Sequence, residues 1–196
     1  MRKSSLLPRC SHLGTRAPLS LAFHKQLNFQ GKTNDRFSLT DENFDEKKVF
    51  AGMLGRKFMT GIANYHIYKT EIHYFYDDYS GALEHIKEQD KLINSSMSLP
   101  QLVRYIFVSF LTHTALYPDM TKKAQVKTRK RLSDNLAQMT AWADNYEGNF
   151  RHLQYAMEAE IARLDGEHYA GGHWLGSFAT YLVTGAGVNR TGRADQ

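Results

Sequence analysis

The sequence has little cysteine, little proline and no long hydrophobic run. It contains one cysteine, Cys10, and four prolines among 196 residues. A lone cysteine excludes a disulfide within the chain and favours a reducing compartment. The most apolar run, LVRYIFVSFL, is interrupted by Arg104 and is far shorter than the roughly 20 residues that a membrane span needs. We therefore expect a cytoplasmic protein without a transmembrane helix.

Acidic residues are absent from the start of the chain, where the first one is Asp35. Several lysines and arginines precede it, so the formal net charge of +5 is concentrated there. Such a start is typical of a mitochondrial transit peptide, and a mitochondrial location is the alternative to the cytoplasm. Apart from a possible helical turn around LAFHKQLNF, the segment shows no sustained periodicity. We predict that residues 1–34 are an irregular basic segment that can be removed with little loss of stability.

Polar turns then separate segments in which apolar residues recur every three or four positions. This spacing puts them on one face of a helix and predicts an all-α fold of about five to six helices. We expect one helical domain over residues 35–166, with an N-cap at Thr40 or Asp41, and an incomplete last repeat and disordered tail over 167–196. The expected helices are 54–75, 80–95, 98–117, one that follows Thr121 and ends in DNYEG, one from Asn149 to Leu164, and a short one over 174–183.

Two segments share the layout of a tetratricopeptide-type helix pair. In IYKTEIHYFYDDYSGALEHIKEQDKL, a tight turn is followed by Tyr79 as a wedge and by the small Ala82 and then Leu83, where two helices would cross closely. EIARLDGEHYAGG begins the same layout, with Gly166 in the turn and Tyr169 as the wedge. The two tyrosines lie about 90 residues apart, which is no multiple of the 34-residue period. We therefore expect a degenerate α-α repeat of antiparallel helix pairs.

The same helices carry a resemblance to a known group of proteins. Over residues 24–166 the chain is similar to the tetratricopeptide-like region of very large bacterial signalling proteins, most specifically in ALYPD, WADN, NF.H and AEIARL.G. Those proteins join a serine/threonine kinase domain, an AAA/STAND-type predicted ATPase, this helical region, a GAF domain and often a histidine kinase. The matching motifs are packing and capping motifs. The resemblance implies a non-catalytic scaffold segment, and the unmatched ends imply a fragment from a truncated or frameshifted gene.

The stretch NFRHLQYAMEAEIARLDG brings a histidine and two glutamates close together in sequence. On a helix, Glu158 and Glu160 point about 200° apart, and His152 points in a third direction. None of the pairs has the spacing of a helical metal site. We interpret these residues as structural, with Glu160 paired to Arg163 on the surface.

Other patterns that suggest chemistry are also incomplete. His66 and His73 are seven residues apart on one helix face, but no carboxylate or cysteine in the pattern completes a metal site. The glycine-rich VTGAGVNRTG lacks room for the helix that a phosphate loop needs after it. We expect no catalytic residue, no metal and no cofactor.

Six basic residues lie between Asp119 and Asp134 without an acidic neighbour. A nucleic-acid surface would need base-reading side chains interleaved with them, and these are absent. The cluster is therefore a solvated helix face or a docking surface for an acidic protein partner, and we expect no nucleic-acid partner. The six residues are Lys122, Lys123, Lys127, Arg129, Lys130 and Arg131.

Three functions remain open from the sequence. The resemblance favours a scaffold segment of a multidomain signal-transduction ATPase or protein kinase, with protein partners or neighbouring domains. The second is a stand-alone helical adaptor that binds a protein partner. The third, from a different class, is a small imported helical metal-dependent enzyme that uses His66 and His73.

Overall fold

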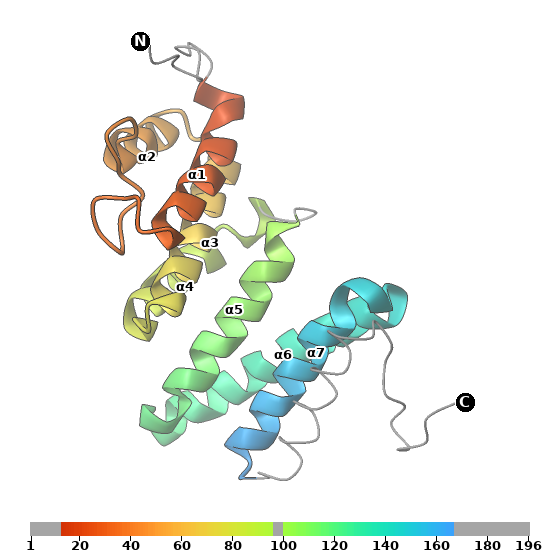
Figure 1. Cartoon of the computed structure of the whole chain (residues 1–196). Helices are drawn as coiled ribbons and strands as arrows, with labels where there is room; N and C mark the ends of the chain where they lie inside the picture. Colours follow the sequence, from red (N-terminus) through yellow and green to blue (C-terminus); the bar gives the residue numbers. More distant parts are fainter. Residues whose placement is uncertain (1–12, 96–99, 167–196) are drawn as a thin grey trace. The chain divides into compact units, whose positions relative to one another are not determined.

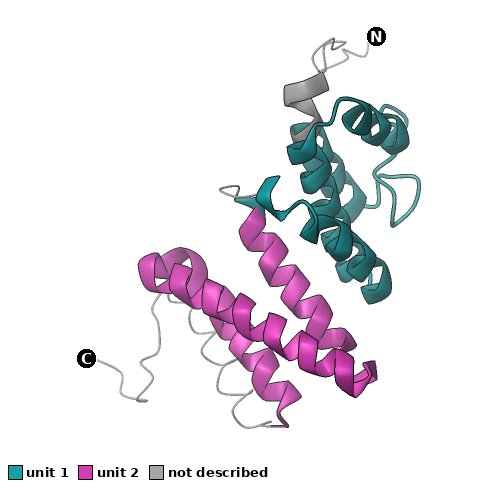
Figure 2. Cartoon of the chain, turned by 180° about the vertical axis from the view of Figure 1, so that it is seen from behind, with its two compact units in different colours: residues 1–101 teal, residues 102–196 magenta. Residues whose placement is uncertain are grey.

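The computed structural model describes residues 13–95 and 100–166, with side chains from residue 19 onward. These residues form seven α-helices and two short 3-10 helices and contain no β-strand (Figure 1). The all-α prediction is confirmed. In the described part of the chain, no helix is long and apolar enough to cross a membrane. The chain divides into two compact units, residues 1–101 and 102–196 (Figure 2).

The first unit is organised around one central helix. Its elements are α1 Leu13–Phe29, α2 Glu46–Gly55, α3 Met59–Phe75, α4 Tyr79–Asp90 and the 3-10 helix η1 Ile93–Ser95. Helix α3 packs against α1, α2, α4 and η1, and for this reason it is buried continuously from Gly61 to Ile72 apart from the partly exposed Tyr65. Such a helix has no solvated face, so polar side chains on it must find partners inside the unit.

Helix α1 corrects the expectation that residues 1–34 are irregular. Its buried residues recur at helical spacing and are Leu21, His24, Lys25 and Asn28. Three of the four are polar, so a search for apolar periodicity misses the helix. The Asn28 amide donates to the carbonyl oxygens of Asp35, Arg36 and Ser38 and thereby holds the following loop. Because α1 contributes these buried residues, we expect its removal to destabilise the unit, which differs from the prediction made from the sequence.

The long helix expected over 54–75 is two helices. Helix α2 ends at Gly55, and α3 begins at Met59 after a turn in which Lys57 has a left-handed φ of 53°. The N-cap of α2 is Asp45, whose side chain accepts from the backbone N–H of Lys48, and neither Thr40 nor Asp41 caps the helix. Apolar residues stay in phase across the break, so their spacing does not reveal it.

The break expected at YDDY is confirmed, and helices α3 and α4 form a hairpin around it. Asp77 takes the left-handed conformation in the turn (φ 61°), which aspartate tolerates better than most residues. Asp78 is the N-cap of α4 and accepts from the backbone N–H of Gly81 at 3.0 Å. Ala82 is fully buried, and its place at the closest crossing of the two helices stays a prediction.

Ala82 gives a test of this packing. Ala82→Leu is expected to lower the free energy of unfolding by about 1–3 kcal/mol, because the larger side chain must separate two packed helices. Ser80→Leu is the control, since Ser80 is exposed on the same helix, and it should be nearly neutral. Urea denaturation followed by circular dichroism measures both. Equal effects at the two positions would show that α4 does not pack as described.

The second unit consists of three helices and a short 3-10 turn. They are α5 Gln101–Leu116, the 3-10 helix η2 Tyr117–Asp119, α6 Lys122–Asn145 and α7 Glu147–Leu164. Phe110 of α5, Leu132 and Met139 of α6 and Met157 of α7 are fully buried and form the core cluster. The three helices therefore share one apolar centre within the unit.

The ends of these helices follow local capping chemistry. Thr121 caps α6 and accepts from the backbone N–H of Ala124, as the sequence predicts. Helix α7 begins at Glu147 after Tyr146, so the expectation of a start at Asn149 is wrong by two residues. Gly166 follows α7 with a φ of 77°, in the turn expected for it. Tyr169, the short helix over 174–183, the glycine-rich VTGAGVNRTG and the tail over 167–196 lie outside the described residues.

Candidate functional site

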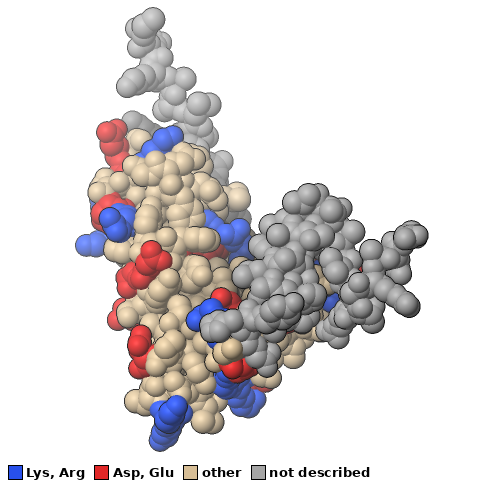
Figure 3. Space-filling model, turned by 60° about the horizontal axis from the view of Figure 1, so that its bottom comes forward, with Lys and Arg blue, Asp and Glu red and all other residues tan. Residues whose placement is uncertain are grey.

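The first candidate site is a basic surface at the start of α6. Lys122, Lys123, Lys127 and Lys130 are exposed, and Val126 among them is 74% exposed. At 100° per residue these five side chains fall within an arc of about 140° around the helix. We call them the lysine face. Figure 3 shows basic and acidic side chains interspersed on the side of the molecule that it draws.

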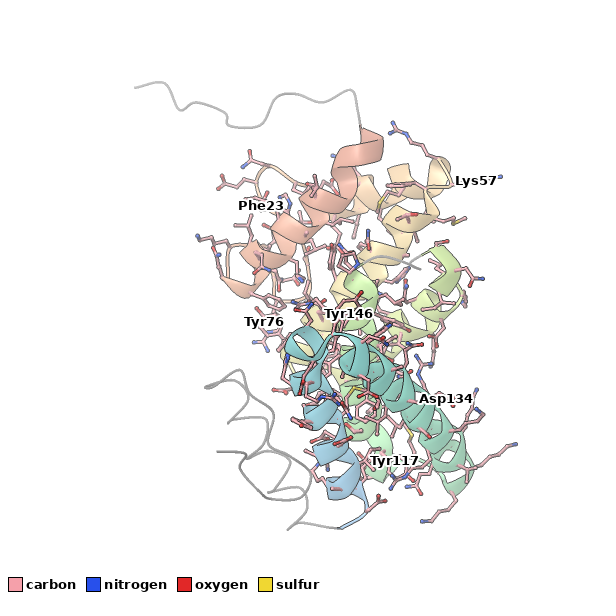
Figure 4. All side chains as sticks on the ribbon, turned by 90° about the vertical axis from the view of Figure 1, so that its right-hand side faces the viewer. Phe23, Lys57, Tyr76, Tyr117, Asp134 and Tyr146 are labelled. Atoms are coloured by element: carbon pink, nitrogen blue, oxygen red, sulfur yellow. The ribbon has the colours of Figure 1, made fainter. Side chains whose placement is uncertain are left out.

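The lysine face is little neutralised by neighbouring acids. Lys130 Nζ lies 2.9 Å from Asp134 Oδ2 in an exposed pair, and Figure 4 labels Asp134 on α6. Lys122, Lys123 and Lys127 have no ion pair with any residue that the structure describes. Exposed ion pairs such as that of Lys130 contribute little stability and are easily exchanged. Among the described residues, little opposes the approach of a negatively charged ligand to this surface.

The two arginines of the predicted cluster are engaged inside the unit. Arg129 forms an ion pair with Asp165 after α7, and its guanidinium lies 5.2 Å from the centroid of the Tyr117 ring, a residue labelled in Figure 4. Arg131 donates to Tyr105 Oη at 3.3 Å and to Ser109 Oγ at 3.1 Å, both on α5. These arginines connect α6 to its neighbours, and we do not include them in the lysine face.

The polar residues of α7 have separate partners. Glu158 Oε1 accepts from Gln154 Nε2 at 2.8 Å, and Glu160 forms the expected surface ion pair with Arg163 at 2.8 Å. Burial lowers the pKa of His152. Within residues 13–95 and 100–166, no group of three or more histidine, cysteine, aspartate or glutamate side chains is arranged to hold a metal ion.

The second candidate site is a group of three imidazoles in the α3–α4 hairpin. The His85 ring of α4 lies between the two histidines named by the sequence, with its centroid 5.2 Å from that of His66 and 5.2 Å from that of His73. His66 Nδ1 and His85 Nδ1 are 3.0 Å apart, and His73 Nδ1 lies 2.8 Å from Asp78 Oδ2. We call these three histidines the histidine cluster. His66 and His73 are thus not directly joined.

Burial decides the electrostatics of the histidine cluster. Burial first, and then the charges of the neighbouring His66 and His73, lower the pKa of His85 to about 3. Burial also lowers the pKa of His66. The pKa of Asp78 is lowered by the hydrogen bond from the backbone of Gly81 and, next, by that with His73. His66 and His85 are therefore neutral at physiological pH, while the carboxylate at the helix N-terminus is charged.

A buried network around Glu46 escaped the sequence reasoning. Its carboxylate accepts from Leu39 N–H at 2.7 Å and from Tyr65 Oη at 2.7 Å, and it pairs with Lys69 Nζ at 3.1 Å. Burial alone would raise the pKa of Glu46, but the charge of Lys69 and these hydrogen bonds hold it below its ordinary value. Burial, with the charge of Glu46 beside it, raises the pKa of Tyr65.

A second buried pair joins Lys25 of α1 to Glu71 of α3 at 2.7 Å, with side chains 6% and 0% exposed. The available signal was the charge of Lys69 and Glu71 inside an otherwise apolar helix pattern, since a charge at a buried position requires a partner. The partners lie outside α3, so their identity could not be read from the helix. The Lys25–Glu71 and Glu46–Lys69 ion pairs connect α1 and α2 to the central helix α3.

Comparison of the chain with protein-family models, with curated proteins and with solved structures gives no match.

Proposed function

We propose that the chain is a non-catalytic helical scaffold segment that docks an acidic protein segment on the lysine face. The resemblance of residues 24–166 to the tetratricopeptide-like region of kinase/ATPase signalling proteins supports a place between the domains of such a protein. Paired helices suit this role, because they bury their apolar residues against each other and leave an outer face for a partner.

The observation that carries the proposal is the composition of the lysine face. Four exposed lysines surround Val126, whose side chain is 74% exposed. An amphipathic acidic helix would match both features, since its carboxylates would meet the ammonium groups and one of its apolar residues would cover the valine. The tetratricopeptide-like pairing of α3 with α4 and of α6 with α7 is part of the same proposal.

Binding of a defined acidic peptide tests it. We expect a fluorescein-labelled 14-residue peptide of glutamates, with leucines at every third or fourth position, to bind the full chain with a micromolar Kd at low salt. Lys123→Glu with Lys127→Glu should weaken binding at least tenfold, because two attractive charges become repulsive. Fluorescence anisotropy measures the Kd.

The control keeps the net charge equal. Lys47→Glu with Lys87→Glu changes two exposed lysines of the first unit and alters the formal charge of the chain by the same amount. It should leave the peptide Kd within about threefold of the unchanged protein, because neither lysine belongs to the lysine face. Equal weakening in both double variants, or no binding at all, would remove the lysine face as a docking surface.

The stand-alone adaptor is the alternative, and it would use the same surface. The coding sequence that flanks this chain in genomic DNA separates the two. Kinase and ATPase sequence next to it, in frame or frameshifted, supports the multidomain scaffold. Intact stop codons and a separate promoter support the adaptor.

A further inference from the structure

Helices α3 and α4 are held together partly by a contact between two imidazoles. His66 Nδ1 and His85 Nδ1 are at hydrogen-bond distance, 3.0 Å apart, so one ring must donate a proton and the other must accept it. If both rings were imidazolium ions, two N–H groups and two positive charges would face each other. The folded pair therefore accommodates fewer protons than two separate histidines.

The surroundings give the pair little room to adapt. Phe50 of α2 lies edge-on to His66 at 5.8 Å between centroids, and Phe37 stacks on His73 at 4.7 Å. His66 is 9% exposed, and His73 fills the space above Gly81 at the start of α4. Aromatic rings therefore flank His66 and His73, and His66 is nearly removed from solvent, so little water is available to replace its hydrogen bond with His85.

Charged groups of both helices act on the cluster. Lys69 of α3 disfavours a charge on His85, and Asp78 before α4 favours it. Glu88 of α4 favours a charge on His66, and Lys91 at the end of α4 opposes it. The charged side chains that α1 and α2 direct at α3 form ion pairs with other residues than the histidines. Glu46 of α2 pairs with Lys69, and Lys25 of α1 pairs with Glu71. No carboxylate among these is bonded directly to His66 or His85.

We propose that the histidine cluster is an acid-sensitive latch of the α3–α4 hairpin, which holds the two helices together while His66 and His85 are neutral and loses that hold as acid protonates His85. This inference is independent of the lysine face, which lies in the other unit. It makes the first unit a part of the scaffold that responds to acidification.

The pKa values set the pH range of the latch. An unfolded histidine titrates near 6.5, whereas burial lowers the pKa of folded His85 to about 3. The stabilisation is fully present above pH 6.5 and is lost as the pH falls from there toward 3, because the open state binds a proton that the closed state does not. At pH 5 this difference alone raises the opening equilibrium constant about 30-fold. Asp78 and Glu88 have lowered pKa values and remain charged at that pH.

Hydrogen exchange of the full chain tests the latch. We expect the protection factors of the α4 amides, Ala82 to Ile86, to fall about 30-fold or more between about pH 7.5 and pH 5. His85→Gln removes the titrating ring and keeps an amide that can donate to His66. The ratio of the protection factors at about pH 7.5 and pH 5 should therefore shrink at least tenfold in this variant. His66→Gln is the second variant, for the case in which His85→Gln does not fold. His152→Gln, outside the cluster, should leave the ratio unchanged.

The outcomes separate clearly. A large ratio in the unchanged chain and in His152→Gln, together with a small ratio in the cluster variants, supports the latch. If the α4 protection factors of the unchanged chain differ by less than about threefold between about pH 7.5 and pH 5, the latch is overturned. A folded histidine with an ordinary pKa would give that small difference. The same large ratio in the cluster variants overturns it as well, because the acid sensitivity would then come from other groups.

Discussion

Glu71→Leu is expected to lower the free energy of unfolding by about 3–5 kcal/mol, because it leaves the ammonium group of Lys25 buried without its carboxylate. Both side chains are almost completely removed from solvent and lie 2.7 Å apart. Lys25 also lies over the Tyr68 ring at 4.9 Å, a contact that offsets only part of the lost attraction. Urea denaturation of the full chain, followed by circular dichroism, measures the change.

The double variant Lys25→Met with Glu71→Leu is the control for this pair. It removes both charges and keeps two long apolar side chains, so much of the lost stability should return, as is found when buried ion pairs are replaced by packed apolar residues. A Glu71→Leu variant as stable as the unchanged chain would show that α1 does not pack on α3. A double variant as unstable as Glu71→Leu would assign the loss to packing and would contradict the ion-pair argument.

Gly81→Ala is expected to destabilise the chain by about 1–3 kcal/mol, although alanine is the better helix former. A Cβ at residue 81 would lie 2.8 Å from His73 Cε1 and would also collide with the side chain of Asp78. The His73 ring is stacked on Phe37 and hydrogen-bonded to Asp78, so it cannot turn aside without loss of these two contacts. The substitution acts on the hairpin and on the histidine cluster together.

Gly52→Ala should have the opposite sign. Gly52 lies in α2, and a Cβ there meets nothing within 4 Å. The substitution should therefore raise the free energy of unfolding by roughly 0.5–1 kcal/mol, the usual advantage of alanine over glycine in a helix. Thermal or urea unfolding of the two variants gives the comparison. The same sign at both glycines would contradict the close approach of α4 to His73.

Local chemistry explains which helices the sequence reveals. Helices α6 and α7 bury apolar residues at regular spacing, and Thr121 is a strong N-cap, so pattern and cap both identify α6. The same reasoning fails for α1, whose buried face is mostly polar and becomes buried only because α3 supplies Glu71. It also fails at residues 56–58, where the chain turns while the apolar residues remain in phase.

For the candidate sites, the limit of sequence reasoning is the distance along the chain between partners. The lysines of α6 lie within nine residues of one another, so the lysine face is visible in the sequence. The engagement of Arg129 by Asp165 is not visible, because it requires α7 to return beside α6. The contact of His66 with His85 likewise requires the hairpin to bring two helices together. The spacing of residues within one helix does not tell which residue of another helix they will contact.

The helical class, the turn at YDDY, the cap at Thr121 and the charge of the lysine face can all be predicted from the sequence, because each depends on residues within a few positions of one another. The pairing of Lys25 with Glu71 and the meeting of three histidines between α3 and α4 become apparent only in the folded chain. Burial explains the difference. A charge or an imidazole is free to remain solvated on an isolated helix, and it acquires a required partner or a shifted pKa only when another helix excludes water from it.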